Sequence, residues 1–168
     1  MPTELIVLLI SREQTFQLGE CIGRLLDQGG TIALTGAMGT GKSTLAAGIA
    51  HECGSSDYAA SPTFNLLHVH HGRIPVFHFD VWRLKSPREF EDIGGPDYFY
   101  ADGISIVEWA ERISEYLPDD RIEVLLQHAE KGREAFIRGV GRFCDHPGAL
   151  EPMLTSAGFL TTRVPSRD

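Results

Sequence analysis

The chain has 168 residues, of which 42% are hydrophobic, enough to form one soluble globular domain with a substantial core. Its 15 basic and 23 acidic residues give a formal net charge of −8, which argues against unaided binding to DNA or RNA, because such binding depends on neutralising phosphates. The 3 cysteines fit no metal or redox spacing, and no segment resembles a signal peptide or a membrane span, so we expect reduced thiols and a cytoplasmic protein.

The first third of the chain is predicted to alternate strands with helices. Residues 5–10 form an apolar run typical of a strand, and Ser11 is suited to cap a helix that ends before Gly29. A second apolar run, residues 32–34, leads into a glycine-rich segment. The pattern after that segment predicts another helix, which opens at Lys42 and ends near Cys53.

The glycine-rich segment carries the pattern of a phosphate-binding loop, Gly36-x-x-x-x-Gly41-Lys42-Ser43. Glycines let backbone N–H groups curl around a phosphate, and the helix that follows turns its partial positive end toward the anion. Lys42 can then reach the β- and γ-phosphates, while the Ser43 hydroxyl is suited to bind Mg²⁺. A glycine-rich turn is the simpler alternative, but the strand before and the helix after favour a nucleoside triphosphate site.

The rest of the chain reads as two hairpins separated by helices and a buried strand. The expected elements are a hairpin of residues 63–71 and 74–79, a helix that Ser86 caps, a strand at 104–107, a helix near 109–116, and a hairpin of residues 121–127 and 134–140. Residues 1–143 are therefore predicted to form a P-loop ATPase domain of the α/β class. Its central sheet is expected to be P-loop NTPase-like and partly parallel, flanked by helices and carrying β-hairpins. Residues 144–168 are expected to form a partly disordered C-terminal tail with one short helix at most.

Two predicted strands end in a carboxylate, Asp80 in one and Glu108 in the other. In a parallel α/β sheet the carboxyl ends of the strands meet at the ligand crevice, so both side chains would face the phosphates. Hydrolysis needs an acidic group to organise Mg²⁺ and another to orient water. An acidic residue also caps whatever follows a strand in many proteins, but two of them beside a phosphate-binding loop favour a functional role.

Several histidines invite a metal-site interpretation. His68 and His70 share a strand face, but alternation within a hairpin produces that arrangement by itself, and no cysteine joins them. His78 lies two residues before Asp80 on the same face, where it is better placed to support the predicted active site.

Taken together, the motifs resemble the TsaE family, small bacterial ATPases of threonylcarbamoyladenosine synthesis on tRNA. The resemblance covers roughly residues 5–140. In family order, its motifs are Gly36 to Thr44, Ser61-Pro62-Thr63-Phe64, His78-Phe79-Asp80-Val81-Trp82-Arg83-Leu84, residues 89–99, Val107-Glu108-Trp109 and Gly132-Arg133-Glu134. Ala37-Met38 replaces the Asp-Leu that is common in the loop, and Trp82 stands where tyrosine is usual.

The resemblance implies a role for each matched position. Asp80 is implied to be the catalytic carboxylate that orients or deprotonates water, and Lys42 to bind the transferred phosphates. Ser43 and Glu108 would hold Mg²⁺. The positions implied to contact or sense ATP are Gly36, Gly39, Thr40, Gly41, Lys42, Ser43, Thr44, Thr15, Thr63, Trp109 and Arg133. Thr63 would sense the γ-phosphate, and Trp109 is expected either in the core or near the base.

The function that the resemblance implies is Mg²⁺-dependent hydrolysis of ATP that drives or resets the complex of TsaB and TsaD, which modifies adenosine 37 of tRNA. Contact with tRNA would be indirect, through that complex, and no DNA or membrane partner is expected. Two alternatives remain from the residues themselves. One is a small-molecule P-loop kinase, although residues 86–103 hold a single arginine where such kinases carry an arginine-rich lid. The other is a nucleotide-gated binding module without meaningful turnover.

Overall fold

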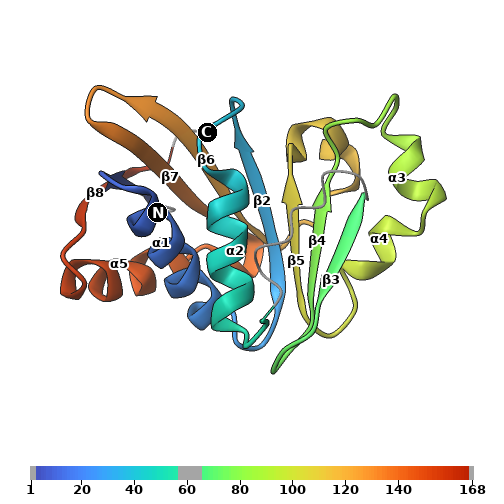
Figure 1. Ribbon diagram of the computed structural model, residues 1–168, viewed down its shortest axis with the longest axis horizontal. Helices are drawn as coiled ribbons and strands as arrows, with labels where there is room; N and C mark the ends of the chain where they lie inside the picture. The colour runs from blue at the N-terminus through green and yellow to red at the C-terminus, as the bar shows by residue number, and fades with distance from the viewer. Residues whose placement is uncertain (1–2, 57–65, 167–168) are drawn as a thin grey trace.

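The computed structural model describes residues 3–56 and 66–166, which fold around an eight-stranded sheet (Figure 1). The order of the strands across the sheet is β3-β4-β5-β2-β6-β7-β1-β8. Their bounds are Thr3–Leu9 for β1, Gly30–Gly36 for β2, Leu67–His70 for β3, Val76–Asp80 for β4, Ile104–Glu108 for β5, Arg121–Ala129 for β6, Gly132–Val140 for β7 and Leu160–Pro165 for β8. Strands β4, β5, β2 and β6 are parallel, and the other pairings are antiparallel. The predicted α/β class, with its partly parallel sheet and its hairpins, is confirmed.

Helices cover this sheet unevenly. Figure 1 shows α1 and α2 side by side against one face, α5 beside α1, and α3 and α4 at the far end beyond β4. The bounds are Arg12–Leu25 for α1, Lys42–Glu52 for α2, Arg88–Asp92 for α3, Gly95–Tyr98 for α4 and His146–Ser156 for α5, with short 3₁₀ helices η1 at Ala110–Tyr116 and η2 at Gly141–Phe143. The helix α1 begins as its sequence predicts, because the Ser11 side chain accepts a hydrogen bond from the backbone N–H of Gln14.

Two hydrophobic clusters lie on opposite faces of the sheet. Ile32 and Leu34 of β2 join the larger cluster, beneath α1, α2 and α5. Ala33, between them in the sequence, joins a second cluster that includes Phe79 and Phe90. Side chains of a strand alternate between its two faces, so β2 is buried on both sides. The central strands are thereby fixed from both faces, and their carboxyl ends carry the predicted site residues.

Some elements differ from the sequence-based expectation. The strand of the first hairpin spans Leu67–His70, and the earlier residues that we expected in it, 63–65, lie outside the described residues. The predicted helix near residues 109–116 is a 3₁₀ helix interrupted by non-helical backbone at Ile113. Helix α3 has Pro87 as its N-cap in place of Ser86, one residue later than its sequence suggested.

The segment after Phe143 holds the expected helix, α5, and also a strand that the sequence pattern did not predict. Strand β8 pairs antiparallel with β1, from Thr3 opposite Pro165 to Leu8 opposite Leu160. Leu150, Leu154 and Phe159 are buried in the larger hydrophobic cluster. The structure thus describes residues 146–165 as a helix and a strand, where the sequence pattern indicated one short helix at most. Residues 160–165 lack a clear apolar alternation because they form an exposed edge, and the partner that orders them is the distant N-terminal strand.

Within the described residues, we find no helix with the length and apolarity needed to cross a membrane.

The three free cysteines differ in burial, which makes their reactivity a test of the packing. Cys21 and Cys53 are buried, and Cys144 is partly exposed. Burial raises the pKa of the Cys53 thiol to about 11 and also raises the pKa of Cys21. Since the thiolate is the reactive form, a chromogenic disulfide reagent at pH 8 should label Cys144 rapidly and the other two only after denaturation. The fast phase should disappear in Cys144→Ser, and rapid labelling of two or more thiols in the native wild-type protein would contradict the described core.

Candidate functional site

The phosphate-binding loop connects the end of β2 to the start of α2. Gly39 and Gly41 have φ angles of +79° and +106°, in the left-handed region, and Gly41 is the N-cap of α2. The 11-residue helix α2 therefore begins at Lys42 with its unpaired backbone N–H groups directed toward the loop. This is the backbone arrangement that the sequence motif predicts for binding a phosphate.

Lys42 holds the loop together from within. Its side chain is 5% exposed, and Nζ donates to the carbonyl oxygens of Gly36 at 2.7 Å and Ala37 at 2.9 Å. The ammonium also lies 4.0 Å from the centroid of the Trp109 ring, within the range of a cation–π contact. Burial lowers the pKa of Lys42 from its ordinary value. The Thr40 hydroxyl, also buried, donates to the carbonyl of Ala37 at 2.8 Å and closes the same turn.

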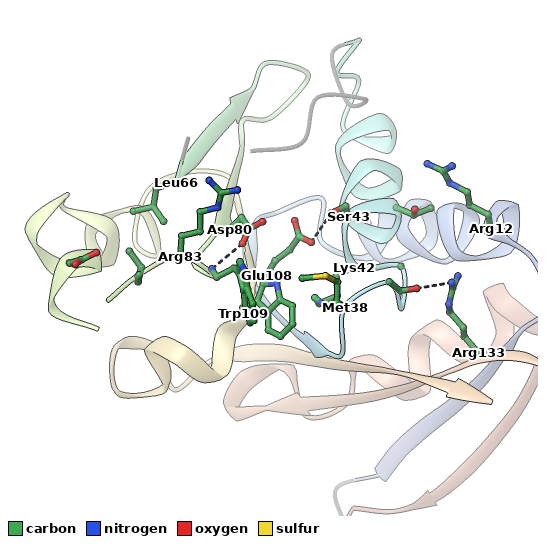
Figure 2. A pocket seen from close by; sticks show the side chains of 16 residues that line it. Arg12, Met38, Lys42, Ser43, Leu66, Asp80, Arg83, Glu108, Trp109 and Arg133 are labelled. Carbon is green, nitrogen blue, oxygen red and sulfur yellow. Dashed lines mark hydrogen bonds between the residues drawn. The ribbon is translucent and has the colours of Figure 1, made fainter. Parts of the chain in front are cut away.

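Glu108 at the end of β5 links the loop to the sheet. Its Oε1 accepts a hydrogen bond from the Ser43 hydroxyl at 2.8 Å, and its Oε2 lies 2.6 Å from Nε2 of His78 (the bond to Ser43 is drawn in Figure 2). A carboxylate and a hydroxyl oxygen at this separation are the hard oxygen donors that Mg²⁺ prefers. The residues present therefore fit the predicted magnesium site.

Asp80 stands beside Glu108 in the sheet, because the two residues are paired in the parallel register of β4 and β5. In Figure 2 its carboxylate turns toward the same pocket. Asp80 Oδ1 accepts a hydrogen bond from the backbone N–H of Trp82 at 3.0 Å. Burial raises the pKa of Asp80, and the neighbouring charge of Glu108 raises it further, although the bond from Trp82 opposes these effects. A carboxylate with a raised pKa is a better proton acceptor.

Trp109 has an unusual backbone that brings its ring over the loop. Among the described residues, Trp109 is the one non-glycine residue whose φ is positive, at 62° with a ψ of 41°. Such a conformation costs on the order of 1–3 kcal/mol, so surrounding contacts must hold it. The indole packs against Trp82, with ring centroids 4.2 Å apart, and against the ammonium of Lys42. Trp109 lines the pocket and also packs against the second hydrophobic cluster.

Thr15 and Arg133 approach the loop from the other side. The guanidinium of Arg133 donates to the carbonyl of Gly39 at 2.7 Å, and its Nε is buried without a hydrogen-bond partner among the described residues. A methyl group added at Gly41 would lie 3.2 Å from Cγ2 of Thr15 and 3.7 Å from Nη1 of Arg133. Elements as distant in sequence as α1 and β7 thus meet at the loop.

These residues surround a pocket of about 820 Å³. Figure 2 shows Arg12 and Arg133 at one end, Arg83 and Leu66 at the other, and Glu108 between them. The predicted site residues that line the pocket are Gly39, Gly41, Lys42, Ser43, Thr44, Asp80, Glu108, Trp109 and Arg133. Gly36, Thr40 and Thr15 lie behind the lining and support the loop, and Thr63 is outside the described residues.

The pocket also contains side chains that the sequence did not identify as site residues. Arg12 and Leu66 line it without having been singled out, and so do five residues that stand in the matched motifs without a binding role: Met38, Trp82, Arg83, Leu84 and Glu89. Arg12 directly follows the helix cap Ser11, and nothing in that local pattern shows that α1 packs against α2 beside the loop. Residues of this kind can be identified from the tertiary packing and not from the local sequence. Among the described residues there is no group of three or more His, Cys, Asp and Glu side chains arranged to hold a metal ion.

Comparison with known proteins gives concordant matches. A family model described as "Threonylcarbamoyl adenosine biosynthesis protein TsaE" matches residues 9–135. The tRNA threonylcarbamoyladenosine biosynthesis protein TsaE of Treponema pallidum is 38% identical over 117 residues, which covers 70% of this chain and 87% of that protein. The protein of the same name from Bacillus subtilis is 32% identical over 134 residues, covering 79% and 84%. The crystal structure of Bacillus subtilis YdiB superposes with a TM-score of 0.70 at 25% identity, covering 92% of this chain and 96% of that one.

Two glycines of the loop allow a matched test of its geometry. A methyl group at Gly36 would lie 2.4 Å from the carbonyl oxygen of Leu126, whereas one at Gly39 would meet nothing within 4 Å. Both have a positive φ, so both alanine variants carry backbone strain. Because of its additional clash, Gly36→Ala should lower the free energy of unfolding by roughly 1–3 kcal/mol more than Gly39→Ala in urea titrations. Equal losses would show that β2 and β6 do not approach as described.

Proposed function

The chain belongs to the TsaE family, and we propose from this that it is a Mg²⁺-dependent ATPase that acts as an accessory subunit in tRNA threonylcarbamoyladenosine synthesis. A role in that biosynthesis follows from the family itself. The finer proposal is that ATP hydrolysis drives or resets a complex of TsaB and TsaD that modifies adenosine 37 of tRNA, and that tRNA is met through this complex. The observation that carries the ATPase proposal is the Ser43–Glu108 hydrogen bond, with Asp80 beside it.

We assign the steps of hydrolysis to side chains as follows. Lys42 and the N-terminus of α2 bind the β- and γ-phosphates, and Ser43 and Glu108 supply oxygen ligands to Mg²⁺, which offsets phosphate charge. Asp80 orients the attacking water and accepts its proton, a task that its raised pKa favours. ADP and inorganic phosphate are the products. Arg133 and Thr15 support the phosphate-binding loop where the nucleotide binds.

A small-molecule kinase would use the same phosphate-binding loop but would also need cationic side chains close to the substrate that accepts the phosphate. Arg88 is the arginine of residues 86–103, and its side chain is 82% exposed. Its Nε lies 4.0 Å from Oδ1 of Asp92, and it is not part of the pocket lining. This placement favours hydrolysis over transfer to an acceptor. A binding module without turnover would have no need for a proton acceptor, and Asp80 supports turnover.

The proposal is tested by measuring phosphate release from ATP with the purified chain, alone and with the TsaB–TsaD complex. We expect slow release that rises when the complex is present, requires no acceptor molecule, and disappears in Lys42→Ala. The Lys42→Ala chain should also bind ATP more weakly in calorimetry while remaining folded. Acceptor-dependent release would favour the kinase, and ATP binding without any release in either condition would favour the binding module.

The two carboxylates should give separable defects. Asp80→Asn keeps an oxygen that can accept the Trp82 hydrogen bond but cannot take a proton, so kcat should fall ~10²-fold or more while ATP affinity changes little. Glu108→Gln should instead weaken the Mg²⁺-dependent part of nucleotide affinity. Asp119→Asn, which removes an exposed charge from a residue outside the pocket lining, is the matched control. Normal hydrolysis by Asp80→Asn would remove Asp80 from the proposed mechanism.

A further inference from the structure

We infer that His78 and His70 form a hydrogen-bonded pair whose function is to position Glu108, so that one oxygen of this carboxylate is presented to Ser43 and to the cation. This inference rests on the proposed function, since it gives the magnesium carboxylate its orienting partner. His78 is in this sense a positioning residue, and His70 acts through it.

The three side chains come from adjacent strands and form one continuous buried row. His70 is the last residue of β3, His78 lies in β4, and Glu108 ends β5. Their exposed fractions are 1%, 3% and 2%. His70 Nε2 lies 3.4 Å from His78 Nδ1, and His78 Nε2 lies 2.6 Å from Glu108 Oε2. The row runs from the hairpin at the edge of the sheet to Glu108, which accepts the hydrogen bond from Ser43.

The chemistry of the groups fixes the direction of the hydrogen bond to Glu108, and the tautomer of His78 then decides the direction of the bond to His70. An ionised carboxylate can only accept, so the proton between His78 and Glu108 belongs to Nε2 of His78. In a neutral imidazole the other nitrogen, Nδ1, is then an acceptor and requires a donor when buried. Nε2 of His70 is placed to be that donor. For neutral rings this arrangement corresponds to the Nε2–H tautomer of both histidines.

This arrangement determines what Glu108 can offer to a cation. With Oε2 bound to His78, the carboxylate cannot rotate freely, and Oε1 remains the oxygen that faces Ser43. Partners of this kind orient metal ligands, and their loss typically lowers metal affinity by 10–100-fold. Without His78, Oε2 would be a buried acceptor lacking this donor, which favours a carboxylate turned away from its present orientation.

The first readout is the position of the ring protons, which tests whether His78 donates to Glu108 as inferred. Nitrogen-15 NMR of the imidazole rings in the metal-free wild-type protein should show a proton on Nε2 of both His70 and His78. Signals are assigned by their loss in His70→Gln and His78→Gln. An unprotonated Nε2 on His78 would overturn the inference, because that ring could then not donate to Glu108.

Magnesium dependence provides the second readout. ADP affinity is measured by calorimetry with Mg²⁺ and with a chelator, in the wild type and in three variants. His78→Leu should reduce the Mg²⁺-dependent gain in affinity by ~10-fold or more and leave affinity in chelator unchanged. His78→Gln should restore much of the gain, since its amide can donate to Glu108 and accept from His70. His71→Gln, an exposed neighbour in the same hairpin, is the control and should match the wild type.

The outcomes separate this inference from the proposed function. If the wild type gains no ADP affinity from Mg²⁺, the proposed magnesium site fails, while the tautomers still decide whether His70 and His78 form the pair. If the wild type gains affinity and folded His78→Leu gains as much, the positioning role is refuted. Equal defects in His78→Leu and His78→Gln would also refute it, because packing and not the hydrogen bond would then be what matters.

Discussion

The site depends on the register of three parallel strands. Leu34 of β2 is paired with Glu108 of β5, and Glu108 with Asp80 of β4, so β4 and β5 end level with each other while β2 continues to Gly36. The phosphate-binding loop leaves β2 just after this level, which places Ser43 within hydrogen-bond distance of Glu108. Since side chains alternate along a strand, a slip of one residue in β5 would turn Glu108 to the opposite face and remove it from the loop.

Burial of charge explains why this register has little freedom. Glu108 is 2% exposed and Lys42 5% exposed, and ionised groups so far from water must be bonded. Glu108 is satisfied by Ser43 and His78, and Lys42 by two loop carbonyls and the face of Trp109. Moving any one of these elements would leave a buried charge without a partner. The strained φ of Trp109 is maintained by the same network, because the ring is held between Lys42 and Trp82.

Local sequence patterns predicted most elements, and tertiary packing accounts for what they missed. The loop motif and the carboxylates at strand ends could be identified because the chemistry of each is encoded in a few adjacent residues. The order of the strands could not, since the place of β2 between β5 and β6 depends on residues about 70 to 90 positions away. Strand β8 was missed because its order comes from pairing with β1. Arg12 was missed because its place in the pocket depends on the packing of α1 against α2.

The charges around the pocket connect the acidity of the chain to its proposed chemistry. The protein carries a formal net charge of −8, yet Lys42, Arg12, Arg83 and Arg133 all line one pocket. This concentration of cations provides a local attraction for phosphates that the molecule as a whole lacks. Asp80 and Glu108 lie in the same pocket, and a carboxylate within a few ångströms of a phosphate repels it. A divalent cation between the two would turn that repulsion into attraction. The presence of both cationic and acidic side chains in the pocket thus favours a nucleotide bound with its metal ion over a phosphate without one. A site lined by cations alone would bind either.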